Sequence, residues 1–531
     1  MRIRANQEMS TCCQAIVESL PEASISADSG YVKGRTITHG SLSRGLWKVS
    51  WPILITALCL SIVDLVHVQC AGTLEGNAQA MIGVSDQLMM VCLIIITSFA
   101  NSGAALVSKA YGAGHTKAIA SMKNRIMGLL VVSSIIMLLV LMVLSKVLLA
   151  NFSGCMDNCS YTIAQGQKYL DLVVFALIPY SIVAAINTTF VGIGNSRIQL
   201  LTLFVMTLVD TAMNYLLVIK GWPVAGLGIS AIAISSITAY SVATIVALVL
   251  WHRSAINKKG KLEEQSDLPR ADFIRPLLRV AVPTALQEVA FCGSTFVIFY
   301  ILSLLHHPAE SIAAWTIGQR LEAFAILPLG PLTMAVMVVV GQNVGFGRFE
   351  RAWKATLGVT GLAFCLLSVA AVALYFFAEP LARISTDDIV TRKILVSYLQ
   401  IAAFALPFGV LEEIFNGALQ ALNDCRVPMY ISVFFNWIFG LSLSYLLAVE
   451  LVYGPSGAWM ASTITIAIIA IVITMRFLTK SEWRGLSPLA GKLRTVPVAA
   501  VPLPVPVEEN FADEHISRGK KAQEIELPKD L

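Results

Sequence analysis

The sequence predicts an all-α membrane protein with 12 transmembrane helices in two pseudo-symmetric six-helix lobes. The first observation is composition: 56% of the 531 residues are hydrophobic and 13% are charged, against roughly 25% charged in an ordinary globular domain. The second is a set of apolar runs, each long enough to cross a bilayer core of about 30 Å as a helix. The third is an internal repeat, since the segment that starts at Tyr169 returns in the segment that starts at Tyr398.

The apolar runs and the polar segments divide the chain in order. The expected divisions are a disordered cytoplasmic tail (1–45), a first six-helix lobe (46–252), a cytoplasmic linker (253–280), a second six-helix lobe (281–480) and a second disordered cytoplasmic tail (481–531). The expected spans are about 50–70, 80–108, 126–149, 166–191, 199–219, 226–251, 281–305, 311–341, 355–378, 394–421, 429–451 and 457–478.

Several spans contain proline, which lacks a backbone N–H and disturbs a helix. Examples are Pro179, Pro328, Pro331 and Pro407. We expect these prolines to kink their helices and not to end them, because neighbouring helices in a membrane can satisfy the freed carbonyls.

The charges of the loops alternate along the chain and predict the orientation. One set of loops is rich in Lys and Arg, for example Lys109, Lys123 and Arg125. The opposite set is nearly bare, with no Lys or Arg in 71–79 or in 306–310. Since positive residues are retained in the cytoplasm, we expect a multi-pass protein of the cell membrane with both termini cytoplasmic.

Short motifs recur at equivalent places in the two halves. The recurring pairs are Gly112-x-Gly114 with Gly345-x-Gly347, and Gly194-Asn195-Ser196-Arg197 with Asn423-Asp424-Cys425-Arg426. Together with Pro52 and the later Ile62-Val63-Asp64, these motifs resemble the multidrug and toxic compound extrusion (MATE) transporters. The resemblance covers about 45–485, and it depends on the order and duplication of the motifs.

This resemblance implies two lobes around a central cavity that opens alternately to each side of the membrane. It also implies export of organic compounds in exchange for protons or sodium. The fifth span departs from the family pattern, because the usual Asn-x3-Asp reads Asp210-x3-Asn214 here. Residues at i and i+4 share one face of a helix, so the same groups could still form the ion site.

Asp64 is the first candidate for ion coupling. A charge at the centre of a spanning helix costs on the order of 2.5–3.5 kcal/mol, so an acid there needs a partner or a proton. Asp210 and Asn214 could meet Asp64 across the first lobe. Two neighbouring carboxylates do not easily ionise together, which suits proton exchange. The alternative is that these polar residues only hold helices together.

Further polar residues in the spans are candidates for the substrate cavity. The predicted cavity residues are Asn187, Gln287, Glu288, Arg320, Glu412 and Asn416. Only one of Glu412 and Glu413 is expected to face the cavity, because adjacent helical residues point about 100° apart. Arg320 and Glu322 lie at i and i+2 on the eighth span and do not pair directly, and one of them is a candidate partner for Glu288 or Glu412. For the two asparagines, hydrogen bonding between helices is the alternative.

The favoured function is an ion-coupled antiporter that exports amphipathic organic compounds, with protons favoured over sodium. One alternative is a lipid-linked saccharide flippase of the same superfamily, which needs cations in its cavity to hold pyrophosphate. A membrane-embedded enzyme is less favoured, because we expect no histidine and no nucleophile–base pair within the spans. No cofactor, metal or nucleic acid is expected. The glycines near Gly112 do not form a phosphate loop, because they lack the preceding strand and the following Lys-Ser/Thr. The protein is expected to be a monomer.

Cys155 and Cys159 flank a short outer loop after the third span. A disulfide between them is one expectation, since an oxidising compartment favours the bond. Two free thiols are the alternative, because so short a loop is easily strained.

Overall fold

The computed structural model describes residues 41–72, 76–152, 160–220, 229–254 and 270–480, and within these ranges it contains helices and no strand. The helices of the first half are α3 (Leu42–Gly72), α4 (Gly76–Gly112), α5 (Thr116–Phe152), α6 (Ser160–Val173), η2 (Val174–Ala176), α7 (Leu177–Ile193), α8 (Arg197–Asn214), η3 (Tyr215–Ile219) and α9 (Ser230–Arg253). Both tails and the Cys155–Cys159 loop lie outside the described residues.

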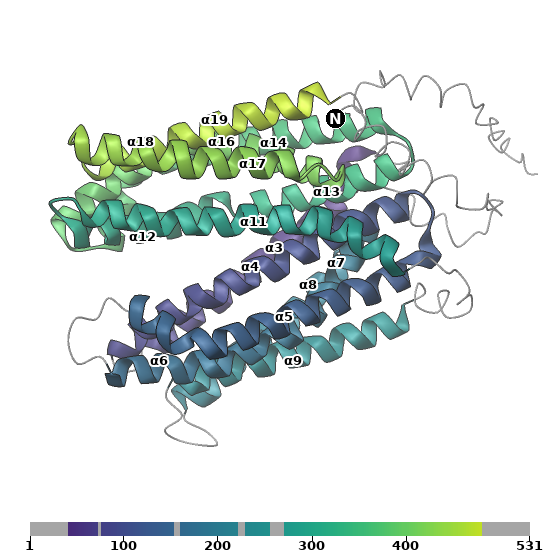
Figure 1. Cartoon of the computed structure of the whole chain (residues 1–531), viewed down its shortest axis with the longest axis horizontal. Coiled ribbons are helices and arrows are strands. Elements are labelled where there is room, and N and C mark those ends of the chain that lie inside the picture. The colour runs from purple at the N-terminus through teal and green to yellow at the C-terminus, as the bar shows by residue number, and fades with distance from the viewer. Residues whose placement is uncertain (1–40, 73–75, 153–159, 221–228, 255–269, 481–531) are drawn as a thin grey trace, which may run out of the picture. The chain divides into compact units, whose positions relative to one another are not determined.

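The second half begins at α11 and repeats the same plan. Its helices are α11 (Arg270–Ser303), α12 (Pro308–Ile326), α13 (Leu329–Gly345), α14 (Phe349–Phe376), α15 (Ala378–Ser385), α16 (Ile389–Ala421), α17 (Arg426–Phe434), η4 (Phe435–Gly440), α18 (Leu441–Tyr445), η5 (Leu446–Glu450) and α19 (Pro455–Thr479). Figure 1 shows the two halves as two sets of long helices that lie side by side.

The number of spans agrees with the predicted twelve when one bent pair is counted as a single span. Eleven described helical segments are long and apolar enough to cross a membrane, and α12 and α13 together form a further segment bent by 46°. We expected Pro328 to kink its helix and not to end it, and this prediction is wrong. Helix α12 ends at Ile326 and α13 begins at Leu329. Pro328 and Pro331 each lack an N–H, so two backbone hydrogen bonds are missing within one turn. Pro407, by contrast, lies inside the continuous helix α16.

Pro52 shows how a neighbouring helix satisfies a carbonyl that a proline frees. The missing N–H of Pro52 would have bonded the carbonyl of Lys48, one turn earlier in α3. The hydroxyl of Ser196, at the start of α8, lies 2.9 Å from the carbonyl oxygen of Val49 and 3.4 Å from that of Lys48. The helix therefore continues through Pro52 with a polar partner beside it.

The repeat is also visible in the turns that end equivalent helices. Gly194 and Asn423 both adopt a left-handed backbone conformation, with φ of 91° and 62°. After each of them, the next backbone N–H closes the turn, from Asn195 to the carbonyl of Phe190 and from Asp424 to that of Leu419, at 2.9 Å in both cases. The same local sequence signal thus ends the fourth helix of each lobe.

The two halves contact each other along a seam at one end of the bundle, here called the basic end because Lys109, Arg348 and Arg351 belong to its turns. Glycines allow α4 and α13 to touch there through their backbones: a Cβ atom on Gly112 would overlap the carbonyl of Gln342. Figure 1 shows the two sets of helices diverging toward the other end.

Apolar side chains fill the rest of this seam. They come from α3, α7, α13 and α14, and they are Val49, Ile53, Val191, Ala335, Val338, Val339 and Ala355. A hydrogen bond crosses the seam as well, from the amide of Gln342 to the carbonyl of Gly192 at 2.8 Å. The basic end is therefore closed by packed side chains and backbone.

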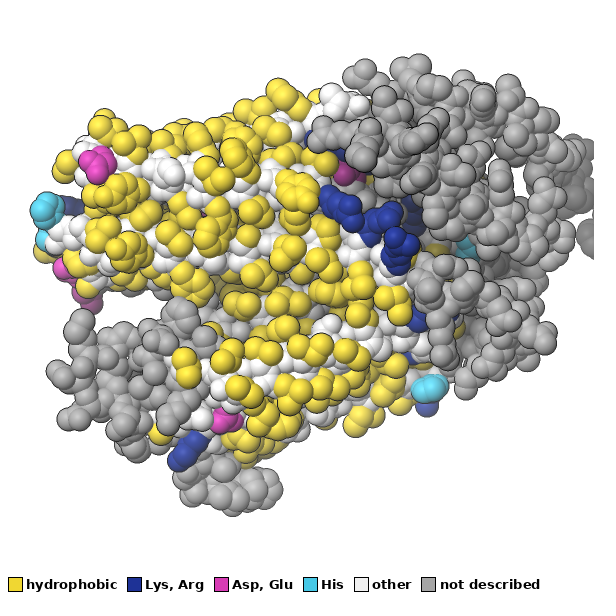
Figure 2. Space-filling model, in the orientation of Figure 1, with side chains coloured by type: hydrophobic (Ala, Val, Ile, Leu, Met, Phe, Trp, Pro, Cys, Tyr) yellow, Lys and Arg dark blue, Asp and Glu magenta, His cyan; other side chains and the backbone are white. Residues whose placement is uncertain are grey.

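The outer surface is apolar over the middle of the molecule. Figure 2 shows hydrophobic side chains over most of this face, with Lys and Arg gathered toward one end. Large exposed hydrophobic side chains include Val143 on α5, Val369 on α14 and Met475 on α19. A surface this apolar matches lipid and not water.

Candidate functional site

A polar cluster in the first lobe surrounds the carboxylate of Asp210. This side chain is only 1% exposed, inside α8. The amide of Asn214 donates to Asp210 Oδ2 at 3.0 Å, and the hydroxyl of Ser235 on α9 lies 3.4 Å from Oδ1. The two predicted residues of the fifth span are thus in contact, since they lie one turn apart on the same face. A π-helical turn, η3, follows Asn214 directly, a feature that is common at functional sites.

His67 on α3 completes this cluster, and the expectation that the spans lack histidine is wrong. Its Nε2 atom lies 2.9 Å from Asp210 Oδ2. The sequence signal was available, because His67 stands inside the apolar run predicted as the first span. A buried carboxylate needs a charged or hydrogen-bonding partner, and an imidazole supplies both.

Asp64 lies in the second half of α3, because the helix begins at Leu42, earlier than predicted. Its side chain is outside the part of the molecule that the structure describes. His67 is three residues further on and therefore on a neighbouring part of the same helix face.

Each lobe contains a tyrosine that donates to a carboxylate. Tyr169 on α6 donates to Asp86 on α4 at 2.8 Å, and Tyr398 on α16 donates to Glu322 on α12 at 2.6 Å. Both tyrosines are the landmarks by which the sequence repeat is found. The repeat therefore preserves a buried polar contact and not only an apolar pattern.

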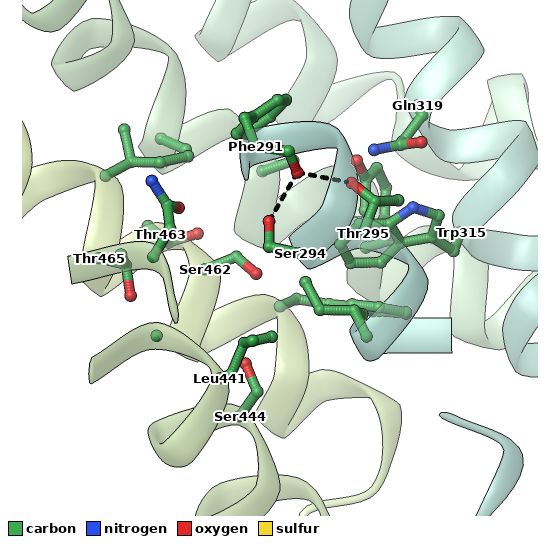
Figure 3. Close-up of a pocket in the computed structure, with 18 of the residues that line it drawn as sticks. Phe291, Ser294, Thr295, Trp315, Gln319, Leu441, Ser444, Ser462, Thr463 and Thr465 are labelled. Atoms are coloured by element: carbon green, nitrogen blue, oxygen red, sulfur yellow. Dashed lines mark hydrogen bonds between the residues drawn. The ribbon is translucent and has the colours of Figure 1, made fainter. Parts of the chain in front are cut away.

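A cavity of about 130 Å³ lies within the second lobe, between α11, α12, α16, α18 and α19. Figure 3 shows Ser294, Thr295, Gln319, Ser462 and Thr463 around it, with the ring of Trp315 at one side. Glu322 is the charged member of its lining. The hydroxyls, aromatic rings and single carboxylate of this lining are groups that favour a positive or neutral polar group.

The cavity residues predicted from sequence in the second lobe lie elsewhere. Gln287 on α11 donates to the hydroxyl of Ser432 on α17 at 3.1 Å. Glu288 on α11 and Glu412 on α16 are half-buried, and Glu413 is exposed. None of these three carboxylates lines the cavity of the second lobe.

Arg320 does not pair with either acid in the described structure. Its side chain is exposed on α12, and among the described residues no ion pair joins it to Glu288 or Glu412. Two positions further on, Glu322 instead points to Tyr398. Sequence spacing places Arg320 and Glu322 on one helix, but it does not show which of them turns inward.

The two asparagines at equivalent places differ in their surroundings. Asn187 is buried, and its side-chain oxygen accepts from Thr202 on α8 at 3.0 Å. Asn416 on α16 is half-buried. In the described residues, Asn187 thus joins two helices of the first lobe.

Among the described residues, no group of three or more His, Cys, Asp and Glu side chains could hold a metal ion. The Asp210 cluster is a carboxylate surrounded by donors. Such a group can exchange a proton with a neighbouring imidazole without a large rearrangement.

Comparison with known proteins places this geometry in a family. The family model described as MatE matches residues 52–216 and 283–446, once in each lobe. A probable multidrug resistance protein NorM of Synechocystis is 26% identical over 443 residues, which are 82% of this chain and 94% of the relative. A second NorM relative, of Deinococcus radiodurans, is 26% identical over 462 residues, covering 84% and 97%.

Solved structures agree with the fold. A variant of the Vibrio cholerae MATE transporter VcmN superposes with a TM-score of 0.76 at 20% identity, over 85% of this chain and 100% of that one. An outward-facing multidrug resistance MATE family transporter gives a TM-score of 0.76 at 15% identity, over 85% and 99%. Since the family model covers more than half of the chain and matches both halves of the repeat, the protein belongs to the MATE family of membrane transporters.

Proposed function

We propose that the protein exports amphipathic organic compounds by alternating access, in exchange for protons and, less favoured, sodium. The observation that carries this proposal is the buried Asp210 carboxylate with its donors His67, Asn214 and Ser235. A buried charge that is neither neutralised nor paired is costly, so protonation of this cluster would change the balance between two arrangements of the lobe. The names of the NorM relatives support organic compounds as the substrate class.

We propose that the protein works as a monomer in the cell membrane, with the basic end and both termini in the cytoplasm. The alternation of loop charge supports this orientation. In this orientation the closed seam would lie on the cytoplasmic side. The flippase alternative gains no support from the cavity, whose charged lining residue is the acid Glu322.

Transport in everted vesicles tests the function. A proton gradient or a sodium gradient would be imposed across the vesicle membrane, one at a time. A panel of fluorescent cationic and neutral dyes would then be added outside the vesicles. We expect uptake of cationic dyes driven by the proton gradient, since each pH unit supplies about 1.4 kcal/mol per proton. Uptake that neither gradient changes would contradict an ion-coupled exporter.

Glu322 is expected to set the preference of the second-lobe cavity for cations. In Glu322→Gln the shape and the acceptor for Tyr398 remain, but the negative charge is gone. We expect cationic dyes to lose about tenfold or more in apparent affinity, which corresponds to about 1.4 kcal/mol, whereas neutral dyes change little. Tyr398→Phe is the matched control, because it removes the hydrogen bond and keeps the charge. Equal losses for cationic and neutral dyes would indicate damage to the lobe and not a role in binding.

A further inference from the structure

The imidazole of His67 is placed as the proton-bearing partner of Asp210. Their atoms are 2.9 Å apart, and among the described residues the side chains in contact with the carboxylate are potential donors: His67, Asn214 and Ser235. An ionised carboxylate only accepts hydrogen bonds, so this surrounding fits a negative Asp210. A negative group buried this deeply needs a positive partner.

We propose that His67 carries the exchanged proton of the first lobe as an ion pair with Asp210, and that the cluster therefore uses protons and not sodium. This rests on the function proposed above and names the coupling ion. Histidine is the side chain that ordinarily changes charge near neutral pH. A protonated imidazole at 2.9 Å from Oδ2 would occupy the position that a sodium ion needs and would repel it.

Burial distinguishes the members of the cluster. The side chain of His67 is 18% exposed, whereas that of Asp210 is 1% exposed. Asn214 and Ser235 have no exposed surface. The imidazole is therefore the most exposed member of the cluster. Loss of its proton leaves the buried carboxylate without a positive partner, and this penalty favours a change in the packing of α3 against α8.

Among the described residues, several other ionisable groups of the first lobe are acids or weak acids. Tyr169 on α6 donates to Asp86 on α4, and Cys70, three residues after His67 on α3, is buried. Helix α13, which also packs on α3, contains no ionisable side chain. Within α3, Asp64 is the remaining acid close in sequence. Negative groups close to an imidazole stabilise its charged form.

The first test does not depend on transport. The purified protein would be labelled with ¹³C at its seven histidines and titrated by NMR, with the His67 signal identified by its loss in His67→Gln or, if that variant is poorly folded, in His67→Asn. We expect the signal to titrate, with a midpoint lower by about one pH unit or more in Asp210→Asn, because the carboxylate that stabilises the cation has been neutralised. A signal that does not titrate, or a midpoint unchanged in Asp210→Asn, would overturn the pair.

The second test measures coupling in proteoliposomes with a cationic dye and separate proton and sodium gradients. We expect proton-driven export to fall about tenfold or more in His67→Gln, and a sodium gradient alone to drive none. His115→Gln is the matched control, because His115 is exposed in the turn between α4 and α5. Sodium-driven export by the parent protein would overturn the proposal. If neither gradient drives export by the parent, the proposed function fails, while the titration still decides whether His67 and Asp210 form the pair.

Discussion

Replacing Asp210 with Asn is expected to abolish proton-driven accumulation of substrate while leaving the protein folded and inserted. The amide keeps the size of the side chain and can still hydrogen-bond Asn214 and Ser235, but it holds no charge to pair with His67. With one proton per substrate, a gradient of one pH unit supports about tenfold accumulation. The variant should approach equal concentrations on both sides, as measured by dye transport at matched expression.

Asp64→Asn is expected to behave in the same way if Asp64 shares the site, and the double variant should then cost little more than either single one. Asp171→Asn is the control, because Asp171 is a half-buried acid of the same lobe that accepts from Ser145, away from Asp210. An Asp210→Asn protein that accumulates dye at the parent level would rule out this cluster. The carboxylates at Glu288 and Glu412 would then be the next candidates.

Substitutions at the glycines of the seam are expected to have the second large effect. A Cβ on Gly112 would overlap the carbonyl of Gln342, and one on Gly341 would overlap the hydroxyl of Ser108. A backbone carbonyl cannot rotate away as a side chain can, so Gly112→Ala should hold the basic end open. Dye export should fall by about tenfold or more, because a transporter that cannot close one side cannot complete its cycle.

Cysteine labelling measures this opening directly. Ser108 has no exposed surface, so a cysteine in its place (Ser108→Cys) should react slowly with a maleimide and about tenfold faster or more when Gly112→Ala is added. Gly128→Ala is the control, since a Cβ there meets no atom within 4 Å. Equal labelling in the two backgrounds would show that the seam tolerates the extra methyl group.

The sequence predicts the architecture well because a membrane restricts the possibilities. The lengths of the apolar runs predict the membrane spans, and the repeat of the Tyr169 segment at Tyr398 predicts the two lobes. The prediction fails at Pro328. A second proline three residues later, Pro331, turns the expected kink into a break between α12 and α13. This is a local property of two missing N–H groups and is not visible in hydropathy.

The site is harder to predict than the fold. Asp210 and Asn214 meet because helix periodicity places i and i+4 together, so their contact could be predicted. His67 stands in an apolar run, but its pairing with Asp210 across 143 positions depends on how α3 packs on α8. In the same way, the inward turn of Glu322 and the outward turn of Arg320 depend on the rotation of α12, which sequence alone does not fix.

The apolar filling of the seam has a thermal consequence. Opening the basic end would transfer side chains such as Val49, Ile53 and Val338 into water and not into lipid. Hydration of apolar surface increases the heat capacity of the opened form. The equilibrium between closed and open forms should therefore give a curved van't Hoff plot, and its enthalpy should change with temperature. A rearrangement confined to lipid-facing helices would expose no such surface to water and would give a nearly straight line.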